Sequence, residues 1–352
     1  IVHDAKGARH ALASRGWTLG GVQFDTMLAA YLAHPDQRSH KLEDVLSRVL
    51  GVVIEEEEGD SEALFDLGDI GAGPSAAQVR AGKLAAHLHP LAQTLRSRLE
   101  ESSEASLLTD MEMPLSVLLG QMEDVGIAAD TGVLDGLSDE LGKAVDAARE
   151  GAWAAAGREV NLSSPKQLQE LLFDHFGLPK TKKTKTGYTT NAEALTDLFE
   201  KTGNDFLRHL LVHRDRIKLK QMVDGLISSI GVDQRIHTTF SQTAAATGRL
   251  ASSEPNLQNI PARSADGLRI RGGFVAQEPY TNLMSADYSQ IEMRIMAHMS
   301  QDPGLIDAFS SGEDLHRTMA AMVFGVEPED VTAEERSRIK ATSYGLAYGL
   351  SA

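Results

Sequence analysis

Residues 283–299, LMSADYSQIEMRIMAHM, join a short apolar segment to a helical pattern. Leu283–Asp287 predicts a short strand, and from Ile291 onward apolar residues recur at every fourth position, as on one face of a helix. A carboxylate at such a junction can hold a divalent cation, because magnesium sites use one or two carboxylates together with substrate phosphates. Position alone favours a simpler interpretation, in which Asp287 caps the helix.

A second helical segment, near the end of the sequence, carries cations and aromatic rings on one face. Arg336, Lys340, Tyr344 and Tyr348 are spaced by four residues and therefore share one side of a helix. Two cations one turn apart suit a polyphosphate, and aromatic rings suit stacking on a base. The alternative is an amphipathic surface helix, which two internal glycines disfavour by roughly 1 kcal/mol each.

Residues 247–261, TGRLASSEPNLQNIP, are rich in amides and hydroxyls around Arg249. Such groups reach phosphates and the acceptors of the DNA minor groove. The same composition suits an ordinary surface loop, so these residues alone leave both interpretations open.

The rest of the sequence predicts a mainly helical chain with a few strands. Residues 1–100 have a mixed α/β pattern, and a helical pattern follows over 104–157. Further expected elements are a helix from Pro165 capped by a residue of 161–164, a flexible basic loop at 179–188, a helix at 205–227, and short strands at 236–241 and 273–276.

The composition gives a misleading first indication of function. A net charge of −16 over 352 residues argues against a nucleic-acid partner. The charge is uneven, however: residues 1–150 hold 12 basic and 26 acidic residues, whereas residues 201–275 hold 11 basic and 6 acidic ones. The absence of cysteine excludes disulfides and thiolate metal sites. Because no apolar run reaches about 18 residues, we expect no membrane partner.

Three segments together resemble a known family. TGRLASSEPNLQNIPAR at 247–263, DYSQIEMRIMAH at 287–298 and RSRIKATSYGLAYG at 336–349 are similar, in this order, to the signature segments of the bacterial DNA polymerase I family, the family-A DNA polymerases. The resemblance implies an α+β multi-domain right-hand polymerase. Its expected parts are an RNase-H-like 3′–5′ exonuclease remnant at 1–103, a mainly helical thumb region with a palm-side entry helix at 104–234, the first part of the palm sheet at 235–300, and the start of the helical fingers at 301–352.

The resemblance also implies the site residues. Asp287, helped by the Tyr288 carbonyl, would bind two Mg²⁺ ions, with the second ligand carboxylate outside this chain. Lys340 would be the catalytic acid for the leaving group. Contacts to the incoming dNTP would come from Gln290, Glu292, His316, Arg336, Lys340 and Tyr344, with Glu292 crowding the sugar 2′ position. Primer–template DNA would be bound by Arg249, Asn256, Gln258, Asn259, Gln290 and Tyr348, and by Arg214, Lys218 and Lys220 of the thumb.

Two departures from the family pattern carry expectations of their own. Tyr344 stands where most relatives have Phe, which predicts weak discrimination against dideoxynucleotides. In the exonuclease part, the positions of family carboxylate and tyrosine residues fall on Ala8, Ala77 and Ala81, and Asp25 is no substitute for them. We therefore expect no proofreading.

The expected function is template-directed DNA synthesis by a cytoplasmic, nucleoid-associated monomer of which this chain is a part. The sequence begins at Ile1 and stops shortly after Gly349, which we interpret as an internal fragment. The alternative is a catalytically inert fragment that only binds primer–template DNA, because the second palm carboxylate is expected beyond Ala352. An exonuclease and a purely structural protein are both disfavoured.

Overall fold

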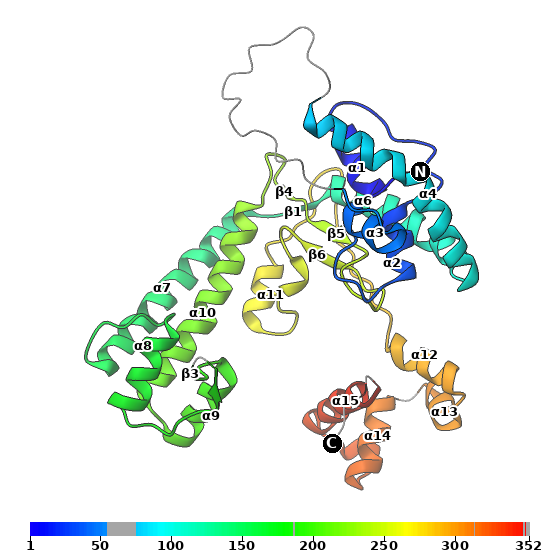
Figure 1. Cartoon of the computed structure of the whole chain (residues 1–352). Helices are drawn as coiled ribbons and strands as arrows, with labels where there is room; N and C mark the ends of the chain where they lie inside the picture. Colours follow the sequence, from blue (N-terminus) through cyan, green and yellow to red (C-terminus); the bar gives the residue numbers. More distant parts are fainter. Residues whose placement is uncertain (55–74, 186, 313, 348, 350–352) are drawn as a thin grey trace, which may run out of the picture. The chain divides into compact units, whose positions relative to one another are not determined.

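The computed structural model describes residues 1–54, 75–185, 187–312, 314–347 and 349 (Figure 1). The chain divides into two compact units, Ile1–Asn282 and Leu283–Ala352. Helices dominate both units, and the strands within the described ranges pair into three two-stranded antiparallel sheets.

The first unit begins with four helices: α1 (Ala5–Ala13), α2 (Thr26–Ala33), α3 (Leu42–Leu50) and α4 (Ala76–Glu101). Asp25 begins α2 by accepting hydrogen bonds from the backbone N–H groups of Met27 and Leu28, and Ser75 begins α4 with a capping box. The apolar faces of α2, α3 and α4 then bury one core, which contains Phe24, Leu28, Val45, Leu46, Leu91, Leu95 and Leu99.

The mixed α/β pattern expected for the first hundred residues is wrong for the part that is described. Residues 1–54 and 75–103 contain helices and one isolated bridge between Val2 and Asp25. Short apolar runs fit a buried helix as well as a buried strand, and here the packing of α2 against α4 selects the helix.

Residues 104–157 are helical as predicted, apart from one short strand. They form α5 (Ala105–Leu107), the π-helical turn η1 (Leu108–Glu112), α6 (Met113–Val125), β1 (Ile127–Ala128) and α7 (Thr131–Ala156). Gly126 makes the sharp passage from α6 to β1 with φ of 61°. A Cβ atom there would lie 2.8 Å from the Ile236 carbonyl oxygen, so this position requires glycine.

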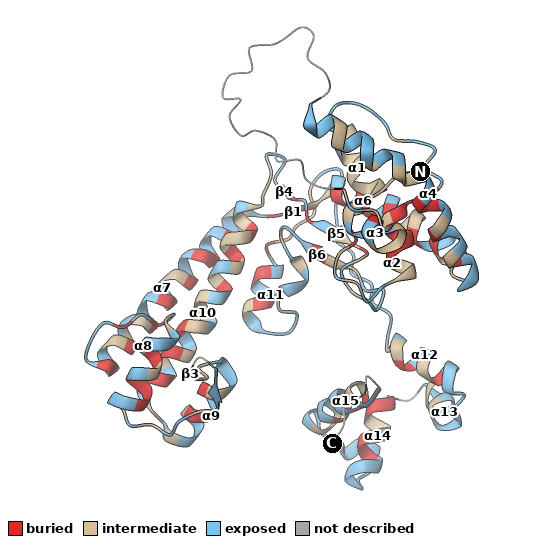
Figure 2. Ribbon diagram, in the orientation of Figure 1, coloured by how far each residue is buried: buried red, intermediate tan, exposed pale blue. Residues whose placement is uncertain are grey.

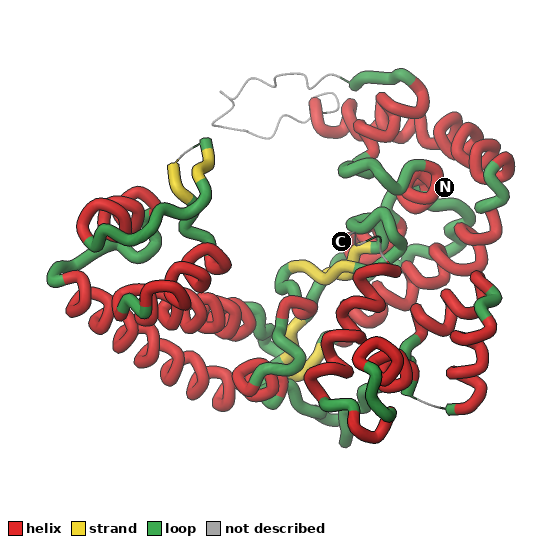
Figure 3. The backbone as a smooth tube through the Cα atoms, turned by 90° about the horizontal axis from the view of Figure 1, so that it is seen from below, coloured by secondary structure: helices red, strands yellow, loops and turns green. Residues whose placement is uncertain are grey.

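Helix α10 (Asp205–Ser228) packs along α7 to form a long helix pair (Figures 1 and 3). Ser138 contacts Lys220 and Gly151 lies against His209, so the two helices run antiparallel. Asn204 begins α10, and the helix ends one residue beyond the predicted Ile227.

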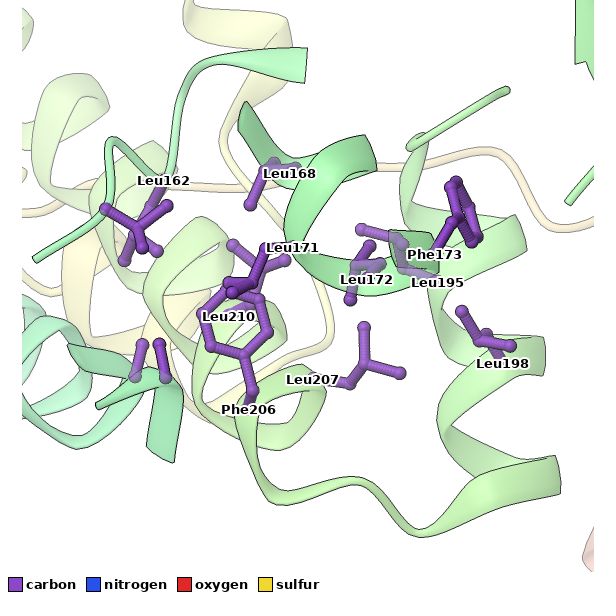
Figure 4. Close-up of a cluster of buried hydrophobic side chains, with 13 residues drawn as sticks. Leu162, Leu168, Leu171, Leu172, Phe173, Leu195, Leu198, Phe206, Leu207 and Leu210 are labelled. Carbon is purple, nitrogen blue, oxygen red and sulfur yellow. The ribbon is translucent and has the colours of Figure 1, made fainter. Parts of the chain in front are cut away.

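The far end of the helix pair carries a separate core. It is covered by α8 (Pro165–Gln169), begun by Ser164 as the sequence predicts, the π-helical turn η2 (Glu170–His175) and α9 (Ala192–Thr202). Figure 4 shows their side chains converging with those of α10, including Leu168, Leu171, Leu172, Leu195, Phe206, Leu207 and Leu210.

The basic segment 179–188 is not entirely a loop. It contains the hairpin strands β2 (Lys183–Thr184) and β3 (Gly187–Tyr188). The Tyr188 ring packs edge-on against Phe173 at 5.3 Å between ring centres, which anchors the hairpin to the core.

The remaining strands of the first unit lie at the base of the helix pair. They are β4 (Arg235–Ile236), which pairs with β1, and β5 (Thr239–Ser241), which pairs with β6 (Ala251–Ser253); the short 3₁₀ helix η3 (Leu257–Asn259) and α11 (Ala265–Arg271) follow.

Three strand expectations need correction. The strand predicted at 236–241 is split between two sheets, and 273–276 contributes only a bridge from Phe274 to Ala129. Leu283–Asp287 is irregular and exposed. A strand needs a neighbour that pairs with its backbone, and the described residues provide none for this segment.

The second unit contains α12 (Ile291–Ser300), α13 (Pro303–Ser311), α14 (Leu315–Phe324), the 3₁₀ turn η4 (Pro328–Asp330) and α15 (Ala333–Ala347). Its core is small, with Ala320, Ala321, Val331 and Ile339 at the contact of α14 and α15, and much of its surface is exposed (Figure 2). None of the helices in the described parts of the chain is long and apolar enough to cross a membrane.

Candidate functional site

Helix α15 carries Arg336, Lys340 and Tyr344 at helical spacing, as predicted. Arg336 Nε donates a hydrogen bond to Asp314 Oδ2 at 2.7 Å. Asp314 also caps α14 by accepting from two backbone N–H groups of its first turn at 3.2 and 3.3 Å. One carboxylate therefore orients the cationic face of α15 against the start of α14.

Asp314 is held in its ionised form. Burial alone would raise its pKa, but the hydrogen bond from Arg336 and those from the backbone outweigh burial and lower the pKa below its usual value. The Arg336 side chain is still 35% exposed, so it can contact a further anion while it is bound to Asp314.

His316 is almost fully buried at 1% exposure, and its ring lies 5.8 Å from the ring of Tyr344. Within the described part of the chain, neither of its ring nitrogens has a hydrogen-bond partner. Burial lowers the pKa of His316, and the adjacent Arg336 lowers it further, so the ring is neutral at pH 7. In this arrangement the ring supports Tyr344, and its nitrogens are covered by protein.

Glu292 and Tyr344 line the same cavity of about 540 Å³ in the second unit. Its other walls are mainly the methionine-rich face of α12, including Met293, Met296 and Met299. The cavity thus combines a carboxylate, a phenol and an apolar wall, a combination that suits a sugar ring or a base.

Gln290 precedes α12 in the left-handed conformation, with φ of 54°. Its Oε1 atom is buried and has no hydrogen-bond partner among the described residues. An unpaired buried amide oxygen next to a candidate binding cavity is consistent with a polar ligand contact.

Asp287 and Tyr288 lie in the irregular segment before α12, and the Tyr288 side chain is 82% exposed. Within the described ranges, no three His, Asp or Glu residues are clustered closely enough to form a complete protein metal site. An exposed carboxylate such as Asp287 still fits magnesium, which often takes one or two carboxylates and completes its shell with water and phosphate oxygens.

The candidate DNA contacts of the first unit cluster around the β5–β6 hairpin. Arg249 is exposed in the loop before β6. The Gln258 side chain accepts from Ser252 N at 3.3 Å and donates to the Leu250 carbonyl at 3.1 Å, while Asn256 caps η3. Asn259, in the same turn, is exposed. The exposed residues Arg249, Asn256, Gln258 and Asn259 therefore lie on the hairpin and its amide-rich flank, which these side-chain hydrogen bonds join.

The three cations predicted on α10 differ in their surroundings. Arg214 donates to the Thr190 carbonyl, and burial lowers its pKa. Lys220 contacts Asp224 at 2.7 Å and Ser138 at 3.2 Å. Lys218 is exposed. Lys218 is therefore the best placed of the three for a phosphate, and the other two also brace the helix pair.

The remaining predicted positions can be described briefly. Tyr348 lies outside the described residues. Ala8 lies in α1, while Ala77 and Ala81 are exposed on α4. Asp25 is 1% exposed and accepts four backbone N–H hydrogen bonds, from Asp4, Ala5, Met27 and Leu28, so it has a structural role.

Two residues of the site were missed by the sequence analysis. Asp314 orients Arg336, and the signal was its place as an Asp N-cap at the start of a helical pattern. Tyr31 binds the loop before Arg249 from more than 200 residues away, and no local pattern could have indicated this contact.

The antiparallel helix pair and the short strands at its base in the first unit, and the cationic helix of the second unit, are consistent with a fragment of the right-hand polymerase fold. The chain belongs to DNA polymerase family A, which matches residues 131–352. Residues 1–59 match the DNA polymerase I ribonuclease H-like domain. The predicted family and fold class are confirmed.

Similar proteins agree with this assignment. The chain is 52% identical to DNA polymerase I of Mycobacterium tuberculosis over 351 residues, which are 100% of this chain and 39% of that protein. DNA polymerase I of Bacillus subtilis is 38% identical over 354 residues, covering 99% of this chain and 40% of the relative. A solved structure, the POL domain of Pol1 from M. smegmatis in complex with DNA primer-template and dNTP, has a TM-score of 0.88 and 52% identity, and covers 99% of this chain and 58% of that one.

Proposed function

We propose that this chain contributes to template-directed DNA synthesis in replication and repair. The observation that carries the proposal is the arrangement of α12, α14 and α15, with Arg336 oriented by Asp314 and with Glu292 and Tyr344 on one cavity. The proposed parts are the exonuclease-like domain at 1–103, the thumb region at 104–234, the first part of the palm at 235–300 and the start of the fingers at 301–352.

The second unit would bind the incoming dNTP. Arg336 and Lys340 would hold the triphosphate, because two cations one helical turn apart match neighbouring phosphates. Tyr344 would contact the sugar, and Glu292 would exclude a 2′-hydroxyl by occupying its space. His316 would act mainly by supporting Tyr344, which modifies the phosphate contact that the resemblance implies.

Two magnesium ions are the proposed cofactor, with Asp287 and the Tyr288 carbonyl as ligands from this chain. Bound magnesium supplies activation of the primer 3′-hydroxyl and neutralises charge on the triphosphate. Lys340 would then donate a proton to the leaving pyrophosphate. Because a second carboxylate is proposed to lie outside this chain, we expect the chain by itself to bind DNA without extending it.

Primer–template DNA is the proposed partner of residues in both units. Arg249, with Asn256, Gln258, Asn259 and Gln290, would contact the minor groove, and Tyr348 would stack at the template position. Lys218, with support from Arg214 and Lys220, would contact phosphates without reading sequence. The M. smegmatis domain was solved with primer-template and dNTP, which supports both as partners of this chain. We propose that the protein acts as a monomer.

Proofreading is proposed to be absent. A two-metal nuclease needs clustered carboxylates, and Ala8, Ala77 and Ala81 stand at positions where the family has functional side chains. Release of a mismatched primer nucleotide by the full protein would contradict this proposal.

Primer extension tests the main proposal. The 352-residue chain should raise the anisotropy of a labelled primer–template but give no extended product. A longer protein that includes the second carboxylate should extend the primer, and Asp287→Asn in that protein should abolish extension without abolishing DNA binding. Extension by the 352-residue chain would show that the expected inertness is wrong, and no extension by the longer protein would refute the proposed function.

A further inference from the structure

The loop at 242–250 joins β5 to β6 and carries Arg249 near its end. Its first residue, Gln242, is buried and donates from Nε2 to Glu112 Oε2 at 2.6 Å and to the Glu112 carbonyl at 3.0 Å. Two residues earlier, within β5, Phe240 N donates to the buried Glu123 Oε1 at 2.6 Å. The start of the loop is therefore fixed to η1 and α6.

The tip of the loop is held by a different part of the chain. The Tyr31 hydroxyl, from α2, donates to the Ala245 carbonyl at 2.7 Å and accepts from Gly248 N at 3.1 Å. Tyr31 is 3% exposed, and its ring stands edge-on to His40 at 5.6 Å between ring centres. Because the ring is buried and braced, the hydroxyl is a fixed point to which the loop binds.

The phenol is in the protonated form that this geometry needs. Burial raises the pKa of Tyr31, and the hydrogen bond from Gly248 only partly opposes this effect, while the nearby Glu112 carboxylate raises the pKa again. The hydroxyl can therefore donate to one carbonyl and accept from one amide at the same time.

Gly248 is the residue directly before Arg249, and it adopts φ of 78°. The left-handed conformation is open to glycine at little energetic expense, so the backbone there has several accessible alternatives. Gly248 N donates both to the Tyr31 hydroxyl at 3.1 Å and, within the loop, to the Ala245 carbonyl at 3.3 Å. The Tyr31 hydroxyl, which binds Ala245 as well, holds this turn in one conformation and so helps to set the direction in which the chain delivers Arg249.

We propose that Tyr31, in the exonuclease-like domain, is a positioning residue for the DNA-contacting loop that carries Arg249. The proposal rests on the proposed function for the role of Arg249, but not for the loop geometry. It assigns a role in the polymerase site to a domain for which we propose no nuclease activity: α2 holds the hairpin loop in the conformation that meets the primer–template.

The first test measures loop geometry and needs no DNA. Tyr31→Phe removes the hydroxyl and keeps the buried ring. Amide hydrogen exchange at Gly248 should become about five- to tenfold faster, because its N–H loses the shorter of its two hydrogen bonds and keeps only the longer one to the Ala245 carbonyl. Tyr280→Phe, which removes an exposed hydroxyl, should leave Gly248 exchange unchanged. Unchanged Gly248 exchange in Tyr31→Phe would overturn the proposal.

The second test measures DNA binding in a double-mutant cycle. Tyr31→Phe and Arg249→Ala should each weaken binding of the chain to a labelled primer–template, by about three- to tenfold. If Tyr31 acts through Arg249, the double variant should bind no more weakly than Arg249→Ala. Fully additive losses would show that Tyr31 does not act through Arg249.

The two tests distinguish failure of the proposed function from failure of the Tyr31 positioning contact. A wild-type chain that fails to bind primer–template would count against the proposed function, while faster Gly248 exchange in Tyr31→Phe would still establish the positioning contact. Thermal unfolding of both tyrosine variants distinguishes local loosening of the loop from general loss of stability.

Discussion

Replacing Glu123 by Gln should destabilise the first unit far more than a neighbouring change of the same type. Glu123 is 7% exposed, and its carboxylate accepts from Lys6 Nζ at 2.5 Å, His10 Nε2 at 2.6 Å and Phe240 N at 2.6 Å. It thus joins α1, α6 and β5. Lys6 is itself only 12% exposed, so Glu123→Gln leaves a buried ammonium without its counter-charge.

The expected loss of stability in Glu123→Gln follows from the burial of this ion pair. Removing one partner of a buried ion pair costs about 3–5 kcal/mol. The Gln amide oxygen can still accept from Phe240 N, which recovers about 1 kcal/mol. We therefore expect a net loss of about 3 kcal/mol, which corresponds to a decrease in Tm of roughly 6–12 °C for a unit of this size.

Thermal unfolding followed by circular dichroism is the assay, and Asp124→Asn is the matched control. Asp124 is the next residue, is 50% exposed and pairs with Arg9 at 3.2 Å and with His10 Nδ1 at 3.0 Å. An exposed pair contributes about 0–1 kcal/mol, so the control should lower Tm by no more than roughly 4 °C. If both variants unfold at the same temperature, the reasoning from the buried ion pair is wrong.

Three further predictions concern the second unit and the helix pair. Tyr344→Phe in the extension-competent protein should lower the ratio of dideoxynucleotide to deoxynucleotide incorporation by at least about tenfold, because one hydroxyl contact is lost. A competition assay measures this ratio, and an unchanged ratio would contradict the prediction. Burial lowers the pKa of His316 below 6.5, so the unfolded chain binds the proton more readily and the wild-type protein should lose stability as pH falls below 6.5. Urea unfolding at about pH 7.5 and about pH 5.5 should show a smaller loss of stability on acidification for His316→Gln than for wild type. Equal losses in the two proteins would contradict this prediction. Phe206→Ala should cost about 3–5 kcal/mol by emptying the core at the tip of the helix pair, whereas Phe206→Leu should cost much less, as chemical denaturation can measure.

The helix pair and helix α15 could be predicted because their signals are local. Asn204 caps a 24-residue helix whose end was placed within one residue, and the four-residue spacing of Arg336, Lys340 and Tyr344 follows from helix geometry alone. Side-chain types at fixed spacing also carried the family resemblance.

The missed features depend on contacts between distant segments. The apolar run Leu283–Asp287 resembles a strand, but pairing decides whether a strand forms. The hydroxyl of Tyr31 binds Gly248, which lies 217 positions later in the chain. The residues around Tyr31 in the sequence indicate only a buried helix. His316 was expected to face phosphate, yet packing against Tyr344 covers its ring, because burial is a property of the assembled helices.

The α7–α10 pair is long compared with its base, so a small rotation at the base would displace the far end by a large distance. Near its base the pair is joined to the rest of the unit by β1 and β4, which are only two residues each, and by ion pairs to α11, Arg216–Asp266 at 2.7 Å and Arg269–Glu140 at 2.6 Å. The passage from α6 to β1 turns at Gly126. Helix α7 has 26 residues and is therefore about 39 Å long at about 1.5 Å per residue. A rotation of roughly 10° at this base would move the basic hairpin end by about 7 Å, close to the spacing of neighbouring phosphates on one DNA strand. In the proposed thumb, such a rotation would change which phosphate the tip reaches.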